Sequence, residues 1–404
     1  MKRIIFVIES MNIGGTEKAL LSMLYEIPPH KYDITILLLE NTGGFIEYIP
    51  DGVRVITLNE YEKLKPIINK SPKETILDLF YKKRFYKCFL AGIHYSFWRF
   101  FNNKMHYYVN QIMVNFKELE EEYDVAVSYQ GPPSHFSAYF VAKKIRAKKK
   151  IQWIHSDVTK LNLDLKEVRN LYKLFDKFYV VSSMAKDNFL SLFPELVDKT
   201  EVFYNVISSK LINEQAELTH GFTDDFKGIR ILTVGRLSGE KGQKITIPVL
   251  SKLIRDGYDV RWYCLGDGPL RDSYQKDIIK YDVEGEYILL GSNPNPYPYI
   301  KECDIYVQPS KFEGYCITLA EAKVFNKPII STNFTGAREQ LIPNRTGLIV
   351  DYDIEQLYES IKLLIENKNL CNQLSKNLSS EKIDTVNEIN RLYQFIDGSN
   401  STMN

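Results

Sequence analysis

Short apolar runs that alternate with helical patterns constrain the fold of this chain more than any other feature. The opening run, residues 3–8, is apolar except for its first residue, as in a strand that helices cover on both faces. A helical segment at 19–25 and two further apolar runs at 34–39 and 53–58 follow it. This βαβ alternation predicts a parallel sheet with helices on both faces.

The same alternation begins again in the second half of the chain. Its apolar runs lie at 229–235, 260–266, 287–291, 304–310, 328–332 and 346–350. A length of 404 residues suits two domains, at roughly 100–200 residues per domain. We therefore expect an α/β fold of two doubly wound, Rossmann-like domains that face each other across a cleft, with ligands at the carboxyl ends of the strands.

The expected domain limits follow from a change of pattern near residues 205–225, where a strand-like run gives way to polar residues. Residues 1–205 would form the first domain and residues 206–383 the second. The C-terminal segment, 384–404, has a helical pattern over 384–396 and ends in a polar tail that we expect to fray.

Charge and cysteine content exclude several classes of protein. The 52 Lys and Arg nearly balance the 51 Asp and Glu, so nothing in the overall charge favours nucleic acid or an acidic polymer. The five cysteines are widely spaced without a CxxC pair, which excludes a disulfide scaffold or zinc ribbon and indicates a reducing compartment. No uncharged apolar stretch approaches the roughly 18–20 residues of a membrane helix, so we expect a cytoplasmic protein.

Two basic segments interrupt this balance. Residues 62–105 carry ten basic, three acidic and ten aromatic side chains, a mixture that suits an anionic membrane surface or a lipid-linked acceptor. A helical pair that packs its aromatics on the first domain explains the pattern equally well. Residues 143–150 form a basic run just before an expected strand, where a solvated helix end is the usual explanation and attraction to anionic lipid the alternative. Neither segment matches a known nucleic-acid-binding module.

Glycines and cations gather where strands are expected to end. Gly14, Gly15 and Thr16 precede a helix, and such a turn lets the backbone approach an anion at the helix N-terminus. In the second half, Arg236 and Lys241 share one loop after a strand. Two fixed cations there suit the developing charge of a diphosphate leaving group.

The most specific motif is the segment 310–322, which follows a buried strand. It contains Glu313 and Glu321, eight positions apart, and the helix that begins between them can present backbone N–H groups to a phosphate. Glu313 would reach a sugar from the loop tip. Glu321, two turns further on, would accept both hydroxyls of a ribose.

Together these motifs resemble the retaining GT-B glycosyltransferases of family 4, glycosyl transferases group 1 of the cell-surface polysaccharide type, over about residues 4–350. The matching segments are GGTE (14–17), VGRLSGEKG (234–242), LGDGP (265–269) and SKFEGYCITLAEA (310–322). The resemblance implies metal-independent transfer of a hexose or N-acetylhexosamine, with retention, from a nucleoside-diphosphate-sugar to an acceptor hydroxyl. A UDP-sugar is the expected donor. The terminal helix would cross back to the first domain.

The resemblance also implies the roles of individual residues. Arg236 and Lys241 would bind the donor diphosphate, Glu313 the transferred sugar and Glu321 the ribose. Where the family often has EGFGLP, this chain has EGYCIT, so Cys316 adds bulk beside the sugar. The other residues expected on the donor side are Gly14, Gly15, Thr16, Gly235, Gly266, Gly314, Tyr315, Ile317, Thr318 and Leu319, of which Thr318 and Leu319 would give backbone amides to the distal phosphate.

His155 follows an expected strand and matches the position of the family's active-site histidine, which contacts the sugar and stabilises charge near the anomeric carbon. With Arg236, Lys241 and Glu313 it completes the expected catalytic set. His135 and Asp157 are the residues expected to contact the acceptor, a glycan or lipid-linked glycan such as capsule, exopolysaccharide or teichoic acid. We expect neither metal nor cofactor, and a peripheral site of action on the inner face of the membrane through 62–105 and 143–150.

Three other functions stay under consideration. A non-catalytic GT-B-like partner subunit would be expected to lose His155 or the paired glutamates. A sugar-nucleotide epimerase would share the architecture but needs no acceptor site. A nicotinamide oxidoreductase needs a glycine fingerprint, which Pro269 and Arg271 spoil in the only similar segment. Whether Glu313 acts as a nucleophile or as an electrostatic partner stays open.

Overall fold

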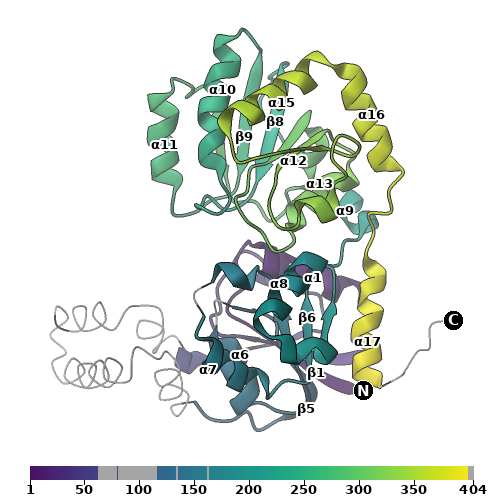
Figure 1. Cartoon of the computed structure of the whole chain (residues 1–404). Coiled ribbons are helices and arrows are strands. Elements are labelled where there is room, and N and C mark those ends of the chain that lie inside the picture. Colours follow the sequence, from purple (N-terminus) through teal and green to yellow (C-terminus); the bar gives the residue numbers. More distant parts are fainter. Residues whose placement is uncertain (62–79, 81–115, 133–134, 162, 399–404) are drawn as a thin grey trace. The chain divides into compact units, whose positions relative to one another are not determined.

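The computed structural model describes residues 1–404 except 62–79, 81–115, 133–134, 162 and 399–404 (Figure 1). The described residues form two compact units. The first unit consists of 1–12, 27–179 and 189–201, and the second of 13–26, 180–188 and 202–404. The basic aromatic segment 62–105 lies almost wholly outside the described residues, so its interpretation stays a prediction.

The first sheet has the strand order β3-β2-β1-β4-β5-β6-β7. Strand β1 pairs in parallel with β2 and β4, and the pairs β2–β3 and β4–β5 are also parallel. The apolar run of β1 is fully buried from Ile4 to Ile8, which confirms a strand covered on both faces. The strands are β1 (Lys2–Ile8), β2 (Tyr32–Leu38), β3 (Arg54–Thr57), β4 (Glu122–Ser128), β5 (Arg146–Ile154), β6 (Lys177–Val180) and β7 (Thr200–Val202).

The second sheet has the order β10-β9-β8-β11-β12-β13 and is parallel throughout. Apolar side chains of the sheet, such as Trp262, form a continuous core with side chains of the covering helices, such as Leu250 and Ile361. The strands are β8 (Ile229–Val234), β9 (Val260–Leu265), β10 (Tyr287–Gly291), β11 (Ile305–Gln308), β12 (Ile329–Thr332) and β13 (Leu348–Val350). All six were predicted from their apolar runs.

Helices follow most strands, and several begin at a side chain that caps their first turn. Asp164, Asp353 and Asn367 each accept a hydrogen bond from a backbone N–H three residues on, which satisfies a donor that the helix leaves unpaired. The α-helices are α1 (Gly15–Glu26), α6 (His135–Lys144), α7 (Leu165–Tyr172), α8 (Ser183–Leu192), α9 (Ser209–Ala216), α10 (Thr246–Arg255), α11 (Arg271–Lys280), α12 (Tyr297–Glu302), α13 (Ile317–Val324), α14 (Ala337–Gln340), α15 (Ile354–Glu366), α16 (Lys368–Ser379) and α17 (Ile389–Asp397).

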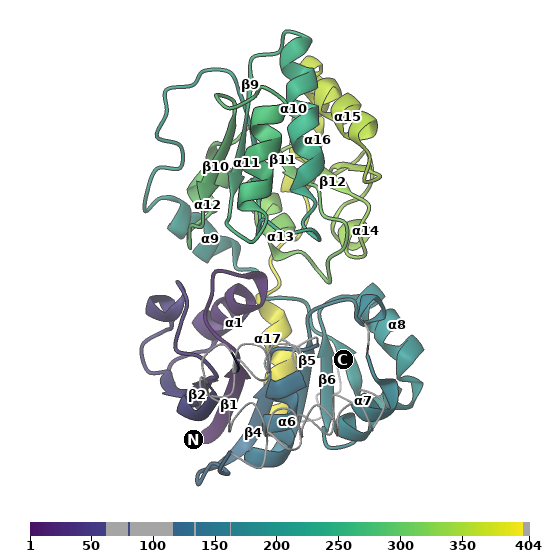
Figure 2. The same cartoon turned by 90° about the vertical axis from the view of Figure 1, so that its left-hand side faces the viewer.

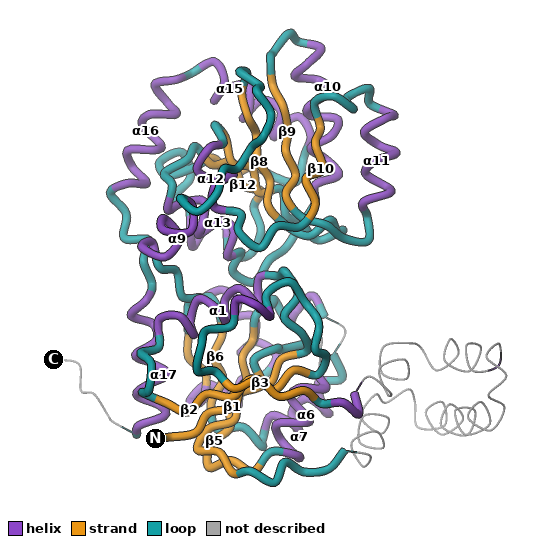
Figure 3. Tube along the Cα trace, turned by 180° about the vertical axis from the view of Figure 1, so that it is seen from behind, coloured by secondary structure: helices purple, strands orange, loops and turns teal. Residues whose placement is uncertain are grey.

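Helices cover both faces of the second sheet, as Figures 2 and 3 show. Helix α10 packs against α15, whereas α12 packs against α13 and α9. In the first unit, α6 packs against β1, β4 and β5. Each unit is therefore the doubly wound, Rossmann-like layer structure that the alternation predicts.

The basic run 143–150 is divided between a helix end and a strand. Lys143 and Lys144 lie in the last turn of α6, which agrees with the helix-end explanation, but the rest of the run does not precede the strand as predicted. Strand β5 already begins at Arg146, and Lys149 and Lys150 are in register with Val125 and Ala126 of β4. Alternation along this strand turns Lys148 outward, where its ammonium lies 2.7 Å from a carboxylate oxygen of Asp124. The run thus lies at the amino end of the strand, and about 17 Å of extended chain separates Lys150 from His155.

The C-terminal helix begins later than predicted. Residues 384–385 are not helical, because they form hydrogen bonds with a distant segment of the second unit. Thr385 exchanges backbone and hydroxyl bonds with Ile207, and the Asp384 carboxylate accepts from Ser209 N at 3.2 Å. A 3-10 turn, Val386–Glu388, then leads into α17. Its predicted crossing to the first domain stays a prediction. No helix in the described part of the chain is long and apolar enough to cross a membrane.

Candidate active site

The expected donor-side loops meet at the carboxyl ends of β8, β9 and β11 in the second unit. The backbones of Gly235 and Gly266, which end β8 and β9, approach so closely that a Cβ on Gly266 would lie 2.1 Å from the Gly235 carbonyl oxygen. Gly242 has φ +70°, and a Cβ on it would lie 2.0 Å from the Pro309 carbonyl oxygen. Glycine is therefore required where these loops pack against each other.

Lys241 and Glu313 form an ion pair at this edge, joining the loop after β8 to the loop after β11. The Lys241 ammonium lies 2.6 Å from a Glu313 carboxylate oxygen, and the side chains are only 22% and 12% exposed. Burial alone would lower the pKa of Lys241, but the Glu313 carboxylate overrides it and raises that pKa. The lysine is a fixed cation, and the roles expected for these two residues toward a donor stay predictions.

Three polar side chains position Glu313. Ser310 Oγ donates to the same Glu313 oxygen at 2.8 Å, and Gln308 Nε2 donates to that hydroxyl at 2.9 Å. The Gln308 amide oxygen in turn accepts from Thr318 Oγ1 at 3.1 Å. Gln308 was not among the site residues expected from the sequence. A buried polar residue at the end of an apolar strand is the pattern that could have identified it.

Helix α13 begins in a strained conformation. Cys316, the residue before its first turn, has φ +69° and ψ 80°, in the left-handed region that glycine tolerates best. Its carbonyl accepts from Leu319 N at 3.2 Å and from Gln340 Nε2 at 3.2 Å. Burial raises the pKa of its thiol to about 12, so the thiol is protonated at neutral pH. The Leu319 amide, one of those expected to bind a phosphate, thus already donates a hydrogen bond to the Cys316 carbonyl.

Glu321 lies inside α13 and is buried, with 2% of its surface exposed. Tyr297 OH donates to its Oε1 at 2.8 Å, and Lys18 Nζ lies 4.7 Å above the Tyr297 ring. Burial raises the pKa of Glu321 and lowers that of Lys18, and the two opposite charges counteract both shifts. No sequence pattern points to Tyr297 or Lys18 as partners of Glu321, because the three residues come from different elements.

The remaining donor-side residues lie in the second unit with less specific contacts. Gly15 and Thr16 open α1, and a Cβ on Gly15 would lie 3.6 Å from the side chain of Ile317. Arg236 differs from Lys241, because its side chain is 66% exposed and pairs with Glu240 at 3.1 Å. Its role toward a diphosphate stays a prediction.

His155 belongs to the first unit and directly follows β5, at the carboxyl edge of the first sheet. Its ring lies 4.7 Å from the Tyr129 ring and stacks on Trp153. Burial lowers the pKa of His155 to about 3, against a hydrogen bond to the backbone of Tyr129 that raises it. The ring is therefore neutral, and its buried Nε2 atom has no hydrogen-bond partner among the described residues.

The two residues expected to contact an acceptor, Asp157 and His135, lie on different elements of the first unit. Asp157 is buried and caps a 3-10 turn, accepting from the backbone N–H of Thr159 at 3.0 Å and from its hydroxyl at 2.6 Å. These contacts explain Asp157 locally, so its acceptor role stays a prediction. His135 is the first residue of α6, and its side chain lies outside the described part of the structure.

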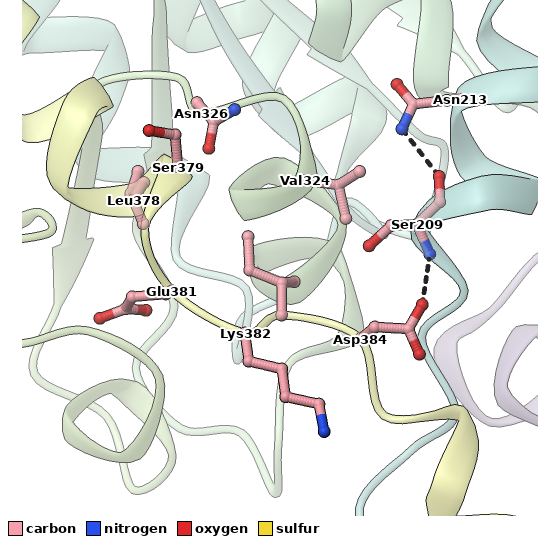
Figure 4. A pocket seen from close by; sticks show the side chains of 10 residues that line it. Ser209, Asn213, Val324, Asn326, Leu378, Ser379, Glu381, Lys382 and Asp384 are labelled. Atoms are coloured by element: carbon pink, nitrogen blue, oxygen red, sulfur yellow. Dashed lines mark hydrogen bonds between the residues drawn. The ribbon is translucent and has the colours of Figure 1, made fainter.

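No group of three or more His, Cys, Asp or Glu within the described ranges could hold a metal ion. The second unit also has a cavity of about 290 Å³ away from these loops, drawn in Figure 4. Ser209, Asn213 and Asp384 line it on one side and Ser379 and Asn326 on the other. None of the expected site residues lines this cavity.

Comparison with solved structures identifies the class of fold. HepE of Anabaena, in complex with UDP and glucose, superposes with a TM-score of 0.70 over 99% of this chain and 100% of that one, at 16% identity. TarM of Staphylococcus aureus, in complex with UDP, superposes with a TM-score of 0.67 over 99% and 100%, at 14% identity. The fold is that of the GT-B glycosyltransferases, as predicted.

Comparison of sequences then identifies the family of the second half. Residues 223–380 match the family described as glycosyl transferases group 1, which confirms the predicted resemblance for this part of the chain. A Campylobacter jejuni N-acetylgalactosaminyltransferase acting on N-acetylgalactosamine-N,N'-diacetylbacillosaminyl-diphospho-undecaprenol is 30% identical over 43% of this chain and 46% of its own length. An uncharacterized glycosyltransferase of Methanocaldococcus jannaschii is 34% identical over 43% of each chain. The matches thus span less than half of these two relatives.

Proposed function

We propose that this protein is a glycosyltransferase that transfers a hexose or N-acetylhexosamine from a UDP-sugar to an acceptor hydroxyl, with retention of the anomeric configuration. The observation that carries the proposal is the buried pair of Lys241 and Glu313 at the carboxyl edge of the second sheet, within the family match. A fixed cation there can stabilise the negative charge that develops on a departing diphosphate. The carboxylate can accept hydrogen bonds from the sugar.

The chemistry needs stabilisation of the charge on the leaving group and a contact beside the anomeric carbon of the sugar. Lys241 supplies the first. Neutral His155, on the first sheet, would supply a ring nitrogen toward the sugar and its acceptor. The departing phosphate would help to deprotonate the acceptor hydroxyl. The cations of the loop after β8 would do the work that a metal would otherwise do at the diphosphate. Glu313 would act beside the sugar, as an electrostatic partner or a nucleophile.

We further propose a lipid-linked or cell-surface glycan as the acceptor. The name of the Campylobacter jejuni relative includes a diphospho-undecaprenol acceptor, and a relative from Staphylococcus aureus, 27% identical over 36% of this chain, is named for capsular polysaccharide biosynthesis. The basic aromatic segment 62–105 would then bring the protein to the inner face of the membrane.

Thermal unfolding and slow hydrolysis with UDP-, GDP-, ADP-, TDP- and CMP-sugars, each with and without EDTA, test the proposal. We expect stabilisation and hydrolysis with UDP-sugars, unchanged by EDTA. Loss of both with EDTA would contradict metal independence. No response to any donor would favour a non-catalytic partner subunit, and C-4 or C-2 epimer products without transfer would favour an epimerase.

A further inference from the structure

Glu321 is a carboxylate in an environment that disfavours its charge. Only 2% of its surface is exposed, and burial raises its pKa. A carboxylate that is to accept two ribose hydroxyls has to be ionised, because a protonated one loses acceptor capacity. The site therefore needs groups that keep the charge on Glu321 and fix the plane of its carboxylate.

Two side chains of the second unit meet that need. Tyr297, at the start of α12, is itself 2% exposed, and its hydroxyl donates to Glu321 Oε1 at 2.8 Å. Hydrogen bonds to a charged acceptor are among the stronger ones in proteins. Lys18, on α1, has its ammonium 4.7 Å from the centre of the Tyr297 ring and counteracts the effect of burial on Glu321.

The position of the tyrosine makes the arrangement specific. Tyr297 and Glu321 come from α12 and α13, two helices of the second unit that pack on each other. A phenol is rigid over its ring, so its hydroxyl can hold one carboxylate oxygen in one place. A serine or threonine at residue 297 would be too short to reach the same oxygen from that backbone position.

We propose that Tyr297 is a positioning residue for nucleotide binding: by holding one oxygen of Glu321, with Lys18 as the balancing charge, it orients the carboxylate toward the 2′- and 3′-hydroxyls of the nucleotide's ribose. This inference rests on the proposed function. The contact between Glu321 and the ribose is the one that the family resemblance implies, and the new element is the role of Tyr297 in holding that carboxylate. Tyr297 acts through Glu321 and does not itself contact the reacting atoms.

The affinities of UDP and 2′-deoxy-UDP, measured by titration calorimetry, test the inference. The wild type should prefer UDP by about 10–100-fold, as expected for a hydrogen bond to a charged group. In Tyr297→Phe the preference should fall below about 5-fold, through weaker binding of UDP and nearly unchanged binding of 2′-deoxy-UDP. Tyr287→Phe is the matched control, because it removes another buried hydroxyl, bonded to Thr246 Oγ1 at 2.7 Å and placed in the core.

A double-mutant comparison separates positioning from general structure. If Tyr297 acts through Glu321, Tyr297→Phe should not change the UDP preference further once Glu321→Gln is present. Lys18→Met should lower the preference in the same direction, and it provides a second variant should Tyr297→Phe fail to fold. Thermal unfolding of each variant monitors the fold independently.

Several results would overturn the inference. An unchanged preference in both Tyr297→Phe and Lys18→Met would do so, as would tighter UDP binding in Tyr297→Phe, which would make the tyrosine a competitor of the ribose. A wild type that binds UDP and 2′-deoxy-UDP equally would overturn it while leaving the proposed donor site intact. A wild type that binds no nucleoside diphosphate at all would overturn both.

Discussion

At the scale of single residues, Lys241 pairs with Glu313, so a substitution of Lys241 would affect both catalysis and stability. Removing the lysine takes a cation from the expected diphosphate site, and it also leaves a carboxylate with 12% exposure without its partner. A carboxylate left unpaired in a buried site destabilises the folded state. Experiments on this loop have to distinguish the loss of catalysis from the loss of stability.

We expect Lys241→Met to reduce donor turnover by about 10²–10³-fold, or about 2.7–4 kcal/mol of transition-state stabilisation. The double variant Lys241→Met, Glu313→Gln should unfold at a higher temperature than Lys241→Met alone, because it no longer buries an unpaired charge. Steady-state kinetics and thermal unfolding measure the two effects. Lys244→Met, which removes a 67% exposed lysine from the same loop, is the control and should leave both unchanged.

His155 gives a pH dependence with a defined sign. Its folded-state pKa of about 3 lies below the usual 6.5, so between these values the unfolded chain binds more protons than the folded one. Stability should therefore fall as the pH falls below about 6.5, by up to ~1.4 kcal/mol per pH unit. Denaturant unfolding of the wild type and of His155→Asn between pH 5 and 7.5 measures this. Equal slopes for the two proteins would contradict a buried neutral histidine.

At the scale of elements, helix α13 begins after Cys316, a non-glycine residue in the left-handed backbone conformation. An L-residue in the left-handed region costs about 1–2 kcal/mol, and glycine avoids most of that cost. We expect Cys316→Gly to raise the free energy of unfolding by about 1 kcal/mol. Asn326→Gly is the control: its φ of +53° is similar, but asparagine tolerates this region and should gain less. Denaturant unfolding that shows no gain for Cys316→Gly would contradict strain at this turn.

The sequence predicted the elements whose pattern is local. Uninterrupted apolar runs such as Ile4–Ile8 identified strands, and glycine turns and paired glutamates identified the loops that contain Lys241 and Glu313. The start of β5 escaped prediction, because four of its first five residues are basic and only pairing with β4 makes them a strand. Tyr297 was not predicted because its contact with Glu321 joins two different helices. Gln308 was not predicted because its contacts form at the end of a buried strand, and no sequence spacing indicates them.

At the scale of the whole molecule, the overall charge is balanced, and two basic segments are candidates for binding a membrane. The position of the run 143–150 in the structure helps to decide between them. Lys148 of the run 143–150 pairs with Asp124, and this run lies at the end of β5 that is distant from His155. We therefore expect 62–105 to be the segment that binds anionic lipid. Its placement lies outside the described residues, so its composition alone supports this expectation.

Replacing Lys82, Lys83 and Arg84 by glutamine should lower co-sedimentation with vesicles that contain phosphatidylglycerol, because each basic residue near the surface contributes about 1 kcal/mol. Replacing Lys144, Lys148 and Lys149 instead removes the same charge and should change co-sedimentation little. Equal binding by the wild type and the first variant, or an equal loss in both variants, would contradict the expectation.

The proposed function requires that the Lys241–Glu313 edge of the second sheet activates a nucleotide-sugar. Release of UDP from UDP-glucose and UDP-N-acetylglucosamine, followed with EDTA present in the wild type and in Lys241→Met, measures this activation. We expect release by the wild type and a loss of about 10²-fold or more in the variant. Equal release by both proteins would remove this edge from the chemistry and disprove its proposed role.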